Sequence, residues 1–354
     1  MPGDRARVAT IAGDGIGPEV VTAAVEVIDA TVSRGSRCIE WLPLEWGSEF
    51  FLETGRMMPT DWLDHLRGCD SILLGAVGDP RVPDHVTLHG LLLPIRRTFD
   101  QYLCLRPVRE YRGVPSPLRN TRAPGIDLVV VRENTEGEYA DVGGRMYQGS
   151  EAELAVQSNV FTRRGCQRII EAAFELATRR RHHVTSVTKS NAQAYGMVLW
   201  DEVFQEVASR HSSVRTKSLL VDAAAMEMVR NPSQFDVIVA SNLFGDILSD
   251  LAAAVVGGLG LTPSGNIDPS RTWPSMFEPV HGSAPDIAGR GEANPVAAVL
   301  AGAMMLDHLG WTDEATDIRQ AVEVILAQDA PRTPDLGGNA RTNEITRSVI
   351  DALH

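Results

Sequence analysis

The chain has 354 residues and a formal net charge of -13. This length exceeds the size at which one hydrophobic core usually stops growing, so two domains are expected. The acidic balance argues against nucleic acid or an anionic membrane as a partner, because both select for basic surfaces. No apolar run approaches membrane-spanning length and the amino terminus has no long apolar segment, so we expect a cytoplasmic protein that does not bind membranes.

The first predicted strand, Val8 to Ile11, leads into a glycine-rich turn and then into a helical pattern. The turn reads Gly-Asp-Gly-Ile-Gly-Pro-Glu from Gly13, a G-x-G-x-G spacing. A Rossmann crossover carries G-x-G-x-x-G, so no Rossmann domain is predicted. A tight strand-to-helix turn without a ligand is the alternative interpretation of these glycines.

A second buried strand, 71–76, is followed by a predicted loop from Gly78 to His89 and then by several arginines. Arg96 and Arg106 flank aromatic residues in an otherwise apolar stretch. Guanidinium groups grip carboxylates bidentately, so these arginines are candidates for binding an acidic substrate. Surface salt bridging is the alternative for each of them singly.

Polar side chains stand at the carboxyl ends of several later predicted strands. The strand 129–131 ends in Arg-Glu-Asn-Thr-Glu-Gly-Glu-Tyr, the strand 184–188 in Lys189, and the strand 218–221 in Asp222. Ligands of open α/β sheets bind at this edge. The pattern therefore predicts a functional site there.

Asp246 and Asp250 are separated by four residues on a helix predicted to follow the strand 237–240. They would lie on one face, one turn apart, with no Lys or Arg between them, so their charges should repel. Mg²⁺ or Mn²⁺ is the simplest remedy, because these ions prefer carboxylate oxygens. A solvated acidic helix face is the alternative, which the surrounding leucines disfavour.

The last third of the chain contains a predicted binding loop, 277–287, and helices at 294–309 and 312–327. Composition does not change abruptly anywhere, and no flexible linker is evident. The domains are therefore expected to be interleaved along the chain.

Five motifs together resemble those of the metal-dependent β-decarboxylating dehydrogenases that act on isocitrate, 3-isopropylmalate, tartrate and D-malate. They are G-D-G-I-G-P-E, R-E-N-T-E-G-E-Y, T-K-S-N, N-L-F-G-D-I-L-S-D and E-P-V-H-G-S-A-P-D-I. The loop from Val82, the F-T-R-R-G at Phe161 and the R-T-P-D-L-G-G-N at Arg332 most resemble the tartrate and D-malate branch.

The resemblance implies an α/β fold of the isocitrate/isopropylmalate dehydrogenase type, with two interleaved α/β domains around a mixed sheet. Residues 1–101 and 257–354 would form the cofactor domain. Residues 102–256 would form the substrate, metal and dimerisation domain. The protein would be a homodimer with a shared active site.

The resemblance also implies roles for individual residues. Those that would hold substrate are Arg96, Arg106, Arg132, His89, Leu92 and Leu93. The metal ligands would be Asp246 and Asp250, with Asp222 from the other subunit. The catalytic pair would be Tyr139 and, across the dimer, Lys189. The cofactor would contact His281, Gly282, Ser283, Ala284, Asp286, Ile287 and Asn294.

The implied activity is NAD-dependent and Mg²⁺- or Mn²⁺-dependent oxidative decarboxylation of D-malate or tartrate. The resemblance suggests a monovalent cation as a further cofactor. A 3-isopropylmalate dehydrogenase is the alternative, because Leu92 and Leu93 match the leucines that pack the isopropyl group in that branch. His89 departs from both patterns. A relative that keeps the fold without catalysis is a third hypothesis.

Overall fold

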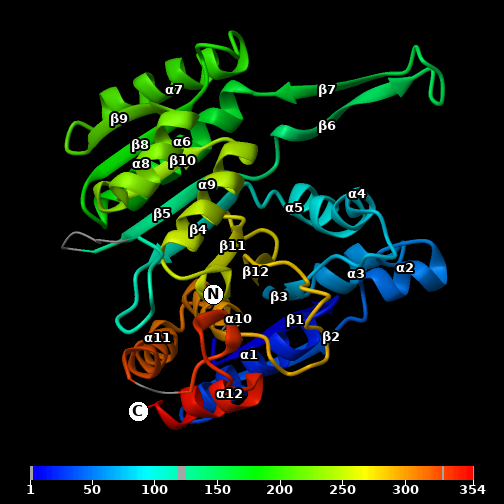
Figure 1. Ribbon diagram of the computed structural model, residues 1–354, viewed down its shortest axis with the longest axis vertical. Helices are drawn as coiled ribbons and strands as arrows, with labels where there is room; N and C mark the ends of the chain where they lie inside the picture. The colour runs from blue at the N-terminus through cyan, green and yellow to red at the C-terminus, as the bar shows by residue number, and fades with distance from the viewer. Residues whose placement is uncertain (1–2, 119–124, 329–330, 354) are drawn as a thin grey trace. The chain divides into compact units, whose positions relative to one another are not determined.

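The computed structural model describes residues 3–118, 125–328 and 331–353 (Figure 1). The chain divides into two compact units. Unit 1 comprises Met1–Gln101, Arg109–Arg119 and Ala253–His354, and unit 2 comprises Tyr102–Val108 and Asn120–Ala252. Unit 1 thus includes Arg109–Arg119, a segment that the sequence prediction assigned to the middle domain.

Unit 1 contributes five strands to a mixed sheet. In spatial order they are β2 (Cys38–Pro43), β1 (Arg5–Gly13), β3 (Ser71–Ala76), β12 (Ser275–Pro279) and β11 (Pro263–Ile267). Strand β1 runs parallel to β2 and β3, whereas β11 and β12 are antiparallel. The predicted strand at 8–11 is therefore confirmed, while Phe277 to Pro279, predicted as loop, belongs to β12.

Alternate residues of β1 face two apolar cores, as the period of a strand requires. Val8 belongs to a core formed with four helices, and Ala9 to a second core on the other face. The first core includes α1 (Gly17–Val32), α10 (Val296–Leu309), α11 (Thr312–Ala327) and α12 (Thr342–Asp351). Helix α1 contacts both α10 and α12 (Figure 1).

The second core is covered by short helices. They are α2 (Ser48–Thr54), α3 (Trp62–Leu66), α4 (Asp84–Thr87), a π-helical turn (Leu88–Leu92) and α5 (Leu93–Thr98). The predicted loop from Gly78 to His89 is thus wrong in its second half, because α4 begins at Asp84. Short 3₁₀ turns lie at Pro232–Gln234 in unit 2 and at Leu259–Leu261 and Pro334–Leu336 in unit 1.

Unit 2 contributes five further strands. In spatial order they are β4 (Leu103–Arg109), β5 (Asp127–Glu133), β10 (Val237–Ala240), β8 (His183–Thr188) and β9 (Arg215–Leu220). From β5 to β9 each pair is parallel, so the carboxyl ends of these strands share one edge. The helices of this unit are α6 (Arg163–Thr178), α7 (Gly196–Arg210), α8 (Val221–Arg230) and α9 (Asn242–Val255).

A separate two-stranded arm completes unit 2 (Figure 1). It consists of β6 (Gly137–Met146) paired antiparallel with β7 (Leu154–Val160), and its register shifts between Gly137 and Val142. Large apolar side chains are exposed along it, namely Val142, Met146, Tyr147, Leu154 and Val156. In the described residues, no helix has both the length and the apolar character needed to cross a bilayer.

Candidate active site

Helix α9 carries the two predicted metal ligands one turn apart. Strand β10 ends at Ala240, and the carbonyl of Ser241 accepts the amide of Gly245 in the first helical turn. The expected repulsion between Asp246 and Asp250 is countered by guanidinium groups. Arg106 Nη1 lies 3.0 Å from Asp246 Oδ1 and 3.5 Å from Asp250 Oδ1. Arg132 Nη1 also pairs with Asp246 Oδ1.

Arg132 is fixed near the end of β5 by residues of α9. Its Nε and Nη2 donate to Asn242 Oδ1 at 3.1 and 2.6 Å. A Cβ at Gly245 would lie 2.8 Å from the Cβ and Cγ of Arg132, so glycine permits the close approach of the helix. The Arg132 side chain is consequently 2% exposed. A buried cation held in this way is prepared to bind anionic groups.

Two residues of this network were not predicted as functional. Asn242 holds Arg132, and Ser249 Oγ accepts from Arg106 Nη1 at 2.7 Å. They stand four residues before and three residues after Asp246, so helical spacing places all three on one face. That spacing within N-L-F-G-D-I-L-S-D was the signal that could have identified them.

Tyr139 joins the same cluster from β6. Its hydroxyl donates to Asp246 Oδ2 at 2.9 Å, and the guanidinium of Arg132 lies 5.5 Å from the ring centroid. Burial, followed by the negative charge of Asp246, raises the pKa of Tyr139 to about 12. The phenol is therefore protonated at neutral pH and can act as a proton donor.

The carboxylate pair fits one side of a divalent cation site. Burial raises the pKa of Asp250, Arg106 acts to lower it, and Asp246 raises it further. The Asp250 side chain is nevertheless 54% exposed, so its oxygens are accessible to an ion. Among the described residues, no group of three or more His, Cys, Asp or Glu side chains is arranged to hold a metal. A third protein ligand would have to come from outside this cluster.

Lys189 and Asp222 are brought together with one another. Lys189 follows β8 and Asp222 lies in the first turn of α8, and the parallel register of Thr188 with Leu220 makes them neighbours. The Lys189 ammonium donates to Asp222 Oδ1 and holds the pKa of that carboxyl below its usual range. The predicted catalytic lysine and the third predicted metal ligand thus form one ion pair.

In unit 1, Arg96 is buried and paired. Its Nη2 lies 2.6 Å from Glu278 Oε1, and Glu278 also accepts from Asn266 Nδ2 at 2.8 Å. The Nε of Arg96 is buried and has no hydrogen-bond partner among the described residues. The guanidinium predicted to bind substrate is thus enclosed in unit 1 and neutralised by Glu278 in this structure.

The predicted cofactor loop packs on the glycine-rich turn. The Ile16 amide donates to Ser283 O at 2.8 Å. A Cβ at Gly15, where φ is +58°, would lie 2.0 Å from the same oxygen, so only glycine fits there. The two interpretations of this turn are compatible, because it is tight and also supports the loop.

His281, within this loop, is suited to bind a ligand in its neutral form. Burial lowers its pKa, and its Nε2 is buried without a hydrogen-bond partner among the described residues. Asp286 is exposed. Asn294 has a role in the fold, because Oδ1 accepts the Val296 amide at the start of α10 and Nδ2 donates to Asp335.

The predicted substrate-selecting residues lie on and beside the π-helical turn. His89 is exposed, and Leu92 is half-buried against the second core of unit 1. Leu93 is only 2% exposed. Of these three side chains, a substrate can reach His89 and part of Leu92 without rearrangement.

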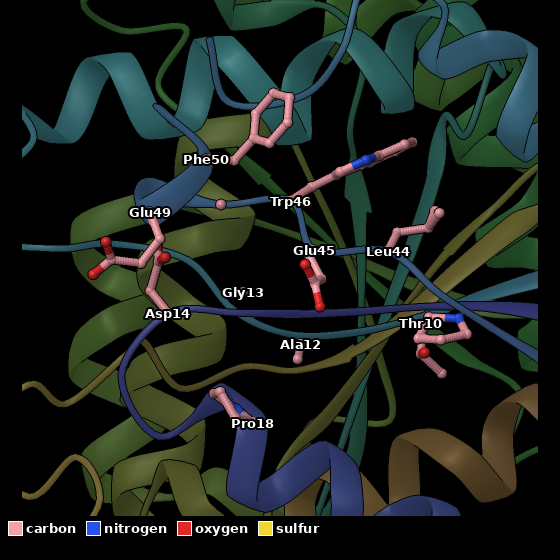
Figure 2. A pocket seen from close by; sticks show the side chains of 12 residues that line it. Thr10, Ala12, Gly13, Asp14, Pro18, Leu44, Glu45, Trp46, Glu49 and Phe50 are labelled. Carbon is pink, nitrogen blue, oxygen red and sulfur yellow. The ribbon is translucent and has the colours of Figure 1, made fainter. Parts of the chain in front are cut away.

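A separate pocket of about 270 Å³ lies in unit 1 at the end of β1. Figure 2 shows that its lining comes from residues 10–18 and 43–50. Asp14 accepts the amide and hydroxyl of Ser48 and the amide of Gly78, so its carboxylate is used by the fold. The pocket contains none of the predicted site residues.

The amino-acid sequence matches a known protein family. Residues 7–353 match the model for isocitrate/isopropylmalate dehydrogenases. The chain is 49% identical to the D-malate dehydrogenase [decarboxylating] of Escherichia coli, with 98% of each covered. It is 46% identical to the tartrate dehydrogenase/decarboxylase of Pseudomonas putida, covering 100% of this chain and 99% of that protein.

Among solved structures, the isocitrate dehydrogenase of Methylococcus capsulatus superposes with a TM-score of 0.89 at 36% identity, covering 98% of this chain and 99% of that one. The expected α/β fold is confirmed, and the named homologues are decarboxylating dehydrogenases. The chain therefore belongs to the isocitrate/isopropylmalate dehydrogenase family and is a decarboxylating dehydrogenase of that family.

Proposed function

We propose that this enzyme catalyses the NAD⁺-dependent, Mg²⁺- or Mn²⁺-dependent oxidative decarboxylation of D-malate, with side activity on tartrate. The observation that carries the proposal is the convergence of Arg106, Arg132 and Tyr139 on Asp246, beside Asp250. Two buried cations, a protonated phenol and two carboxylates are the groups that an acidic substrate and a divalent ion require. The similarity to D-malate and tartrate enzymes supports the choice of substrate.

Both absent groups have residues that fit them. A divalent ion would be held by Asp246 and Asp250 with the partner subunit's Asp222, and would make the substrate hydroxyl more acidic and stabilise the charge left by CO₂. NAD⁺ would be held by the loop from His281 to Ile287, whose unpartnered His281 Nε2 can meet the adenosine half, and would accept the hydride.

The protein's own side chains bind the substrate and transfer protons. Arg106 and Arg132 hold the substrate carboxylates, which fixes the 2-hydroxyl carbon in place. The partner subunit's Lys189 would first release the proton of the ammonium that pairs with Asp222. The neutral amine then accepts the hydroxyl proton as the carbon is oxidised. Tyr139, protonated at neutral pH, supplies the proton that completes the keto product.

The residues of the turn before Arg96 favour the hypothesis that the substrate is small. An isocitrate third carboxylate against Leu91, Leu92 and Leu93 would stay unpaired, at a desolvation cost of several kcal/mol. The isopropyl group of the runner-up substrate would need an apolar pocket. Leu93 is buried and only Leu92 is partly accessible, which favours D-malate over 3-isopropylmalate.

A substrate panel tests this choice. D-malate, the tartrates, 3-isopropylmalate and isocitrate would each be assayed with NAD⁺ and Mn²⁺, and D-malate should show the highest kcat/KM. A kcat/KM for 3-isopropylmalate about tenfold above that for D-malate would instead identify the runner-up. Activity that persists in EDTA would refute the metal requirement, and no NADH from any of these acids would favour a non-catalytic relative.

A shared active site in a homodimer is supported by the surface of unit 2. Apolar side chains are exposed on the arm and also on α8 and α9, at Met226, Val229 and Ile247. Exposed large apolar side chains that recur on several elements of one unit are consistent with a protein interface. The Lys189 and Asp222 pair would then complete the site of the other subunit.

Subunit mixing tests the sharing directly. Asp246→Asn and Lys189→Met homodimers should each be inactive. In a hybrid dimer one site carries both substitutions and the other carries neither, so an equal, fully exchanged mixture should recover about a quarter of wild-type activity. No recovery, despite hybrid formation shown with differently tagged subunits, would place both residues in one subunit's site.

A further inference from the structure

We propose that Glu138 is a positioning residue that holds Tyr139 against Asp246 by anchoring β6 to the first turn of α9. The inference rests on the proposed function, because it gives Glu138 a part in the proton transfer by Tyr139. Glu138 is buried and does not face the carboxylate pair with its own side chain. It acts instead on the two elements that carry the reactive groups.

The backbone around Tyr139 lacks regular support from a neighbouring strand. Gly137 pairs with Val160, but the next pair in the register is Val142 with Ser158, so the ladder is interrupted between them. Asp141 has φ +58°, as expected for an irregular segment of this kind. Side-chain contacts therefore contribute to fixing the position of Tyr139 where strand pairing is irregular.

Glu138 supplies such a contact. Its Oε1 accepts the Ser241 hydroxyl at 2.8 Å, and its Oε2 accepts the Leu243 amide at 3.1 Å. That amide belongs to the first turn of α9, where helix donors have no partner within the helix and a negative charge is favourable. The carboxylate thus caps α9 from another part of the chain.

Consecutive residues of β6 therefore reach consecutive turns of one helix. Glu138 binds the helix at Leu243, and Tyr139 binds it at Asp246, three residues further on. The phenol would lose its fixed distance to Asp246 if the first contact were released. A displacement of about 1 Å at a reacting group can cost on the order of 100-fold in rate.

Three substitutions at Glu138 test how far the rate depends on its contact with α9. Glu138→Leu should lower kcat for D-malate by about 100-fold while KM changes by less than about threefold, because the arginines that bind substrate are untouched. In Glu138→Asp the side chain is one methylene shorter, so kcat for D-malate should fall by about tenfold. Glu138→Gln keeps an acceptor for the Leu243 amide and should retain most of the activity. Equal losses for Gln and Leu would overturn the proposal.

Glu136 provides a matched control two residues earlier. Its carboxylate accepts the amide and hydroxyl of Thr162, the N-cap of α6, so it anchors a different helix. Glu136→Leu should lower the urea midpoint of unfolding without a comparable fall in kcat. A similar fall in kcat for both leucine variants, at similar loss of stability, would reduce the role of Glu138 to general support of the fold.

A double-mutant cycle separates this inference from the proposed function. The shift in urea midpoint that Tyr139→Phe causes in the wild-type background should largely disappear in the Glu138→Leu background, because the hydroxyl contact is already lost. Additive shifts would refute the positioning role. This measurement needs no turnover, so it holds even if the substrate panel shows no activity. Should Glu138→Leu not fold, Glu138→Asp replaces it in the cycle.

Discussion

The two units of the chain use their polar residues differently. In unit 1 the buried groups mostly serve the fold, as Asp14 does for Ser48 and Asn294 does for α10. In unit 2 buried arginines and half-exposed carboxylates are concentrated around α9, and most of the exposed large apolar side chains of the described residues also lie in this unit. The groups proposed to react and most of the exposed large apolar side chains are thus found in the same unit.

This difference indicates which residues tolerate change. A unit whose polar groups satisfy one another loses stability when one is removed, because a buried partner is left unpaired. Asp246 and Asp250 keep like charges close, which guanidinium groups offset in part, and a bound cation would offset the rest. Substitutions in unit 2 should therefore affect activity more than stability, except where they leave a buried arginine unpaired.

The largest effect is expected at the carboxylate pair. Asp246→Asn and Asp250→Asn should each lower kcat/KM by at least about 1,000-fold and weaken Mn²⁺ binding, measured by calorimetry, because each removes a charged ligand. Only Asp246→Asn should also lower the free energy of unfolding, by about 1 to 3 kcal/mol, since it removes the carboxylate that pairs with the buried Arg132 and weakens the pairing of Arg106, which keeps its 3.5 Å contact with Asp250.

Asp250→Asn is the matched control for that stability difference. Asp250 is half exposed and its pKa is raised, so loss of its charge should leave the urea midpoint unchanged or slightly higher. Equal destabilisation by both substitutions would show that the guanidinium contacts to Asp246 contribute nothing specific.

The next effect separates the two proposed proton-transfer residues. Lys189→Met should block oxidation of D-malate, whereas Tyr139→Phe should chiefly slow formation of pyruvate from added oxaloacetate, each by about 100- to 10,000-fold. The oxaloacetate assay distinguishes them, because it bypasses the oxidation step. Equal losses in both assays for both variants would contradict separate roles.

The features that could be predicted from the sequence are those that depend on residues close together in the chain. Strand β10, helix α9 and the shared face of Asp246 and Asp250 follow from a strand pattern and an i, i+4 interval. The cations that hold Asp246 were predicted as substrate arginines, yet their contact with it was not, because Arg132 and Arg106 are 114 and 140 residues away from it in sequence. Such pairings are set by which strands become neighbours, which no local pattern contains.

The Arg-Arg-Arg-His-His run after α6 illustrates the same limit. Considered alone, such a run is consistent with cations that offset the dipole at the carboxyl terminus of a helix. In the structure, Arg180 Nε donates to the buried Asp236 at 2.9 Å, and the Arg181 amide donates to its other oxygen. The run therefore fastens the end of α6 to the start of β10, a role that required knowledge of the sheet order.

A smaller effect should appear in the pH dependence of stability. In unit 2, burial raises the pKa of Glu133 from 4.5 to about 7. The folded state then binds more protons than the unfolded state between these values, so this contribution is present below pH 4.5 and is lost as pH rises through 7. Its size is on the order of 3 kcal/mol. Glu133→Gln should flatten the fall in urea midpoint between pH 5 and about 7.5.

Unit 1 contains a group whose contribution to stability changes with pH in the opposite direction. Burial lowers the pKa of His308 from 6.5 to about 4, so the folded state binds fewer protons than the unfolded state in that interval. This contribution is present above pH 6.5 and is lost as pH falls through 4, and its size is also on the order of 3 kcal/mol. His308→Gln should reduce the fall in urea midpoint as pH decreases from 6.5 to 4, and should leave the urea midpoint above pH 6.5 unchanged. The same pH profile for both variants would contradict the two assignments.

The smallest expected effect concerns the cofactor and lies on the exposed part of unit 1. Asp286 is at the surface and can accept hydrogen bonds from the ribose hydroxyls of NAD⁺, while its charge would repel a 2′-phosphate. Wild-type enzyme should therefore prefer NAD⁺, and Asp286→Asn should reduce the ratio of kcat/KM for NAD⁺ to that for NADP⁺ by about tenfold, chiefly through KM. Stability should not change, because the side chain is exposed. Asp313→Asn, in the first turn of α11, is a control that removes an equal charge outside the cofactor loop. An unchanged cofactor ratio in Asp286→Asn would mean that another residue discriminates the phosphate.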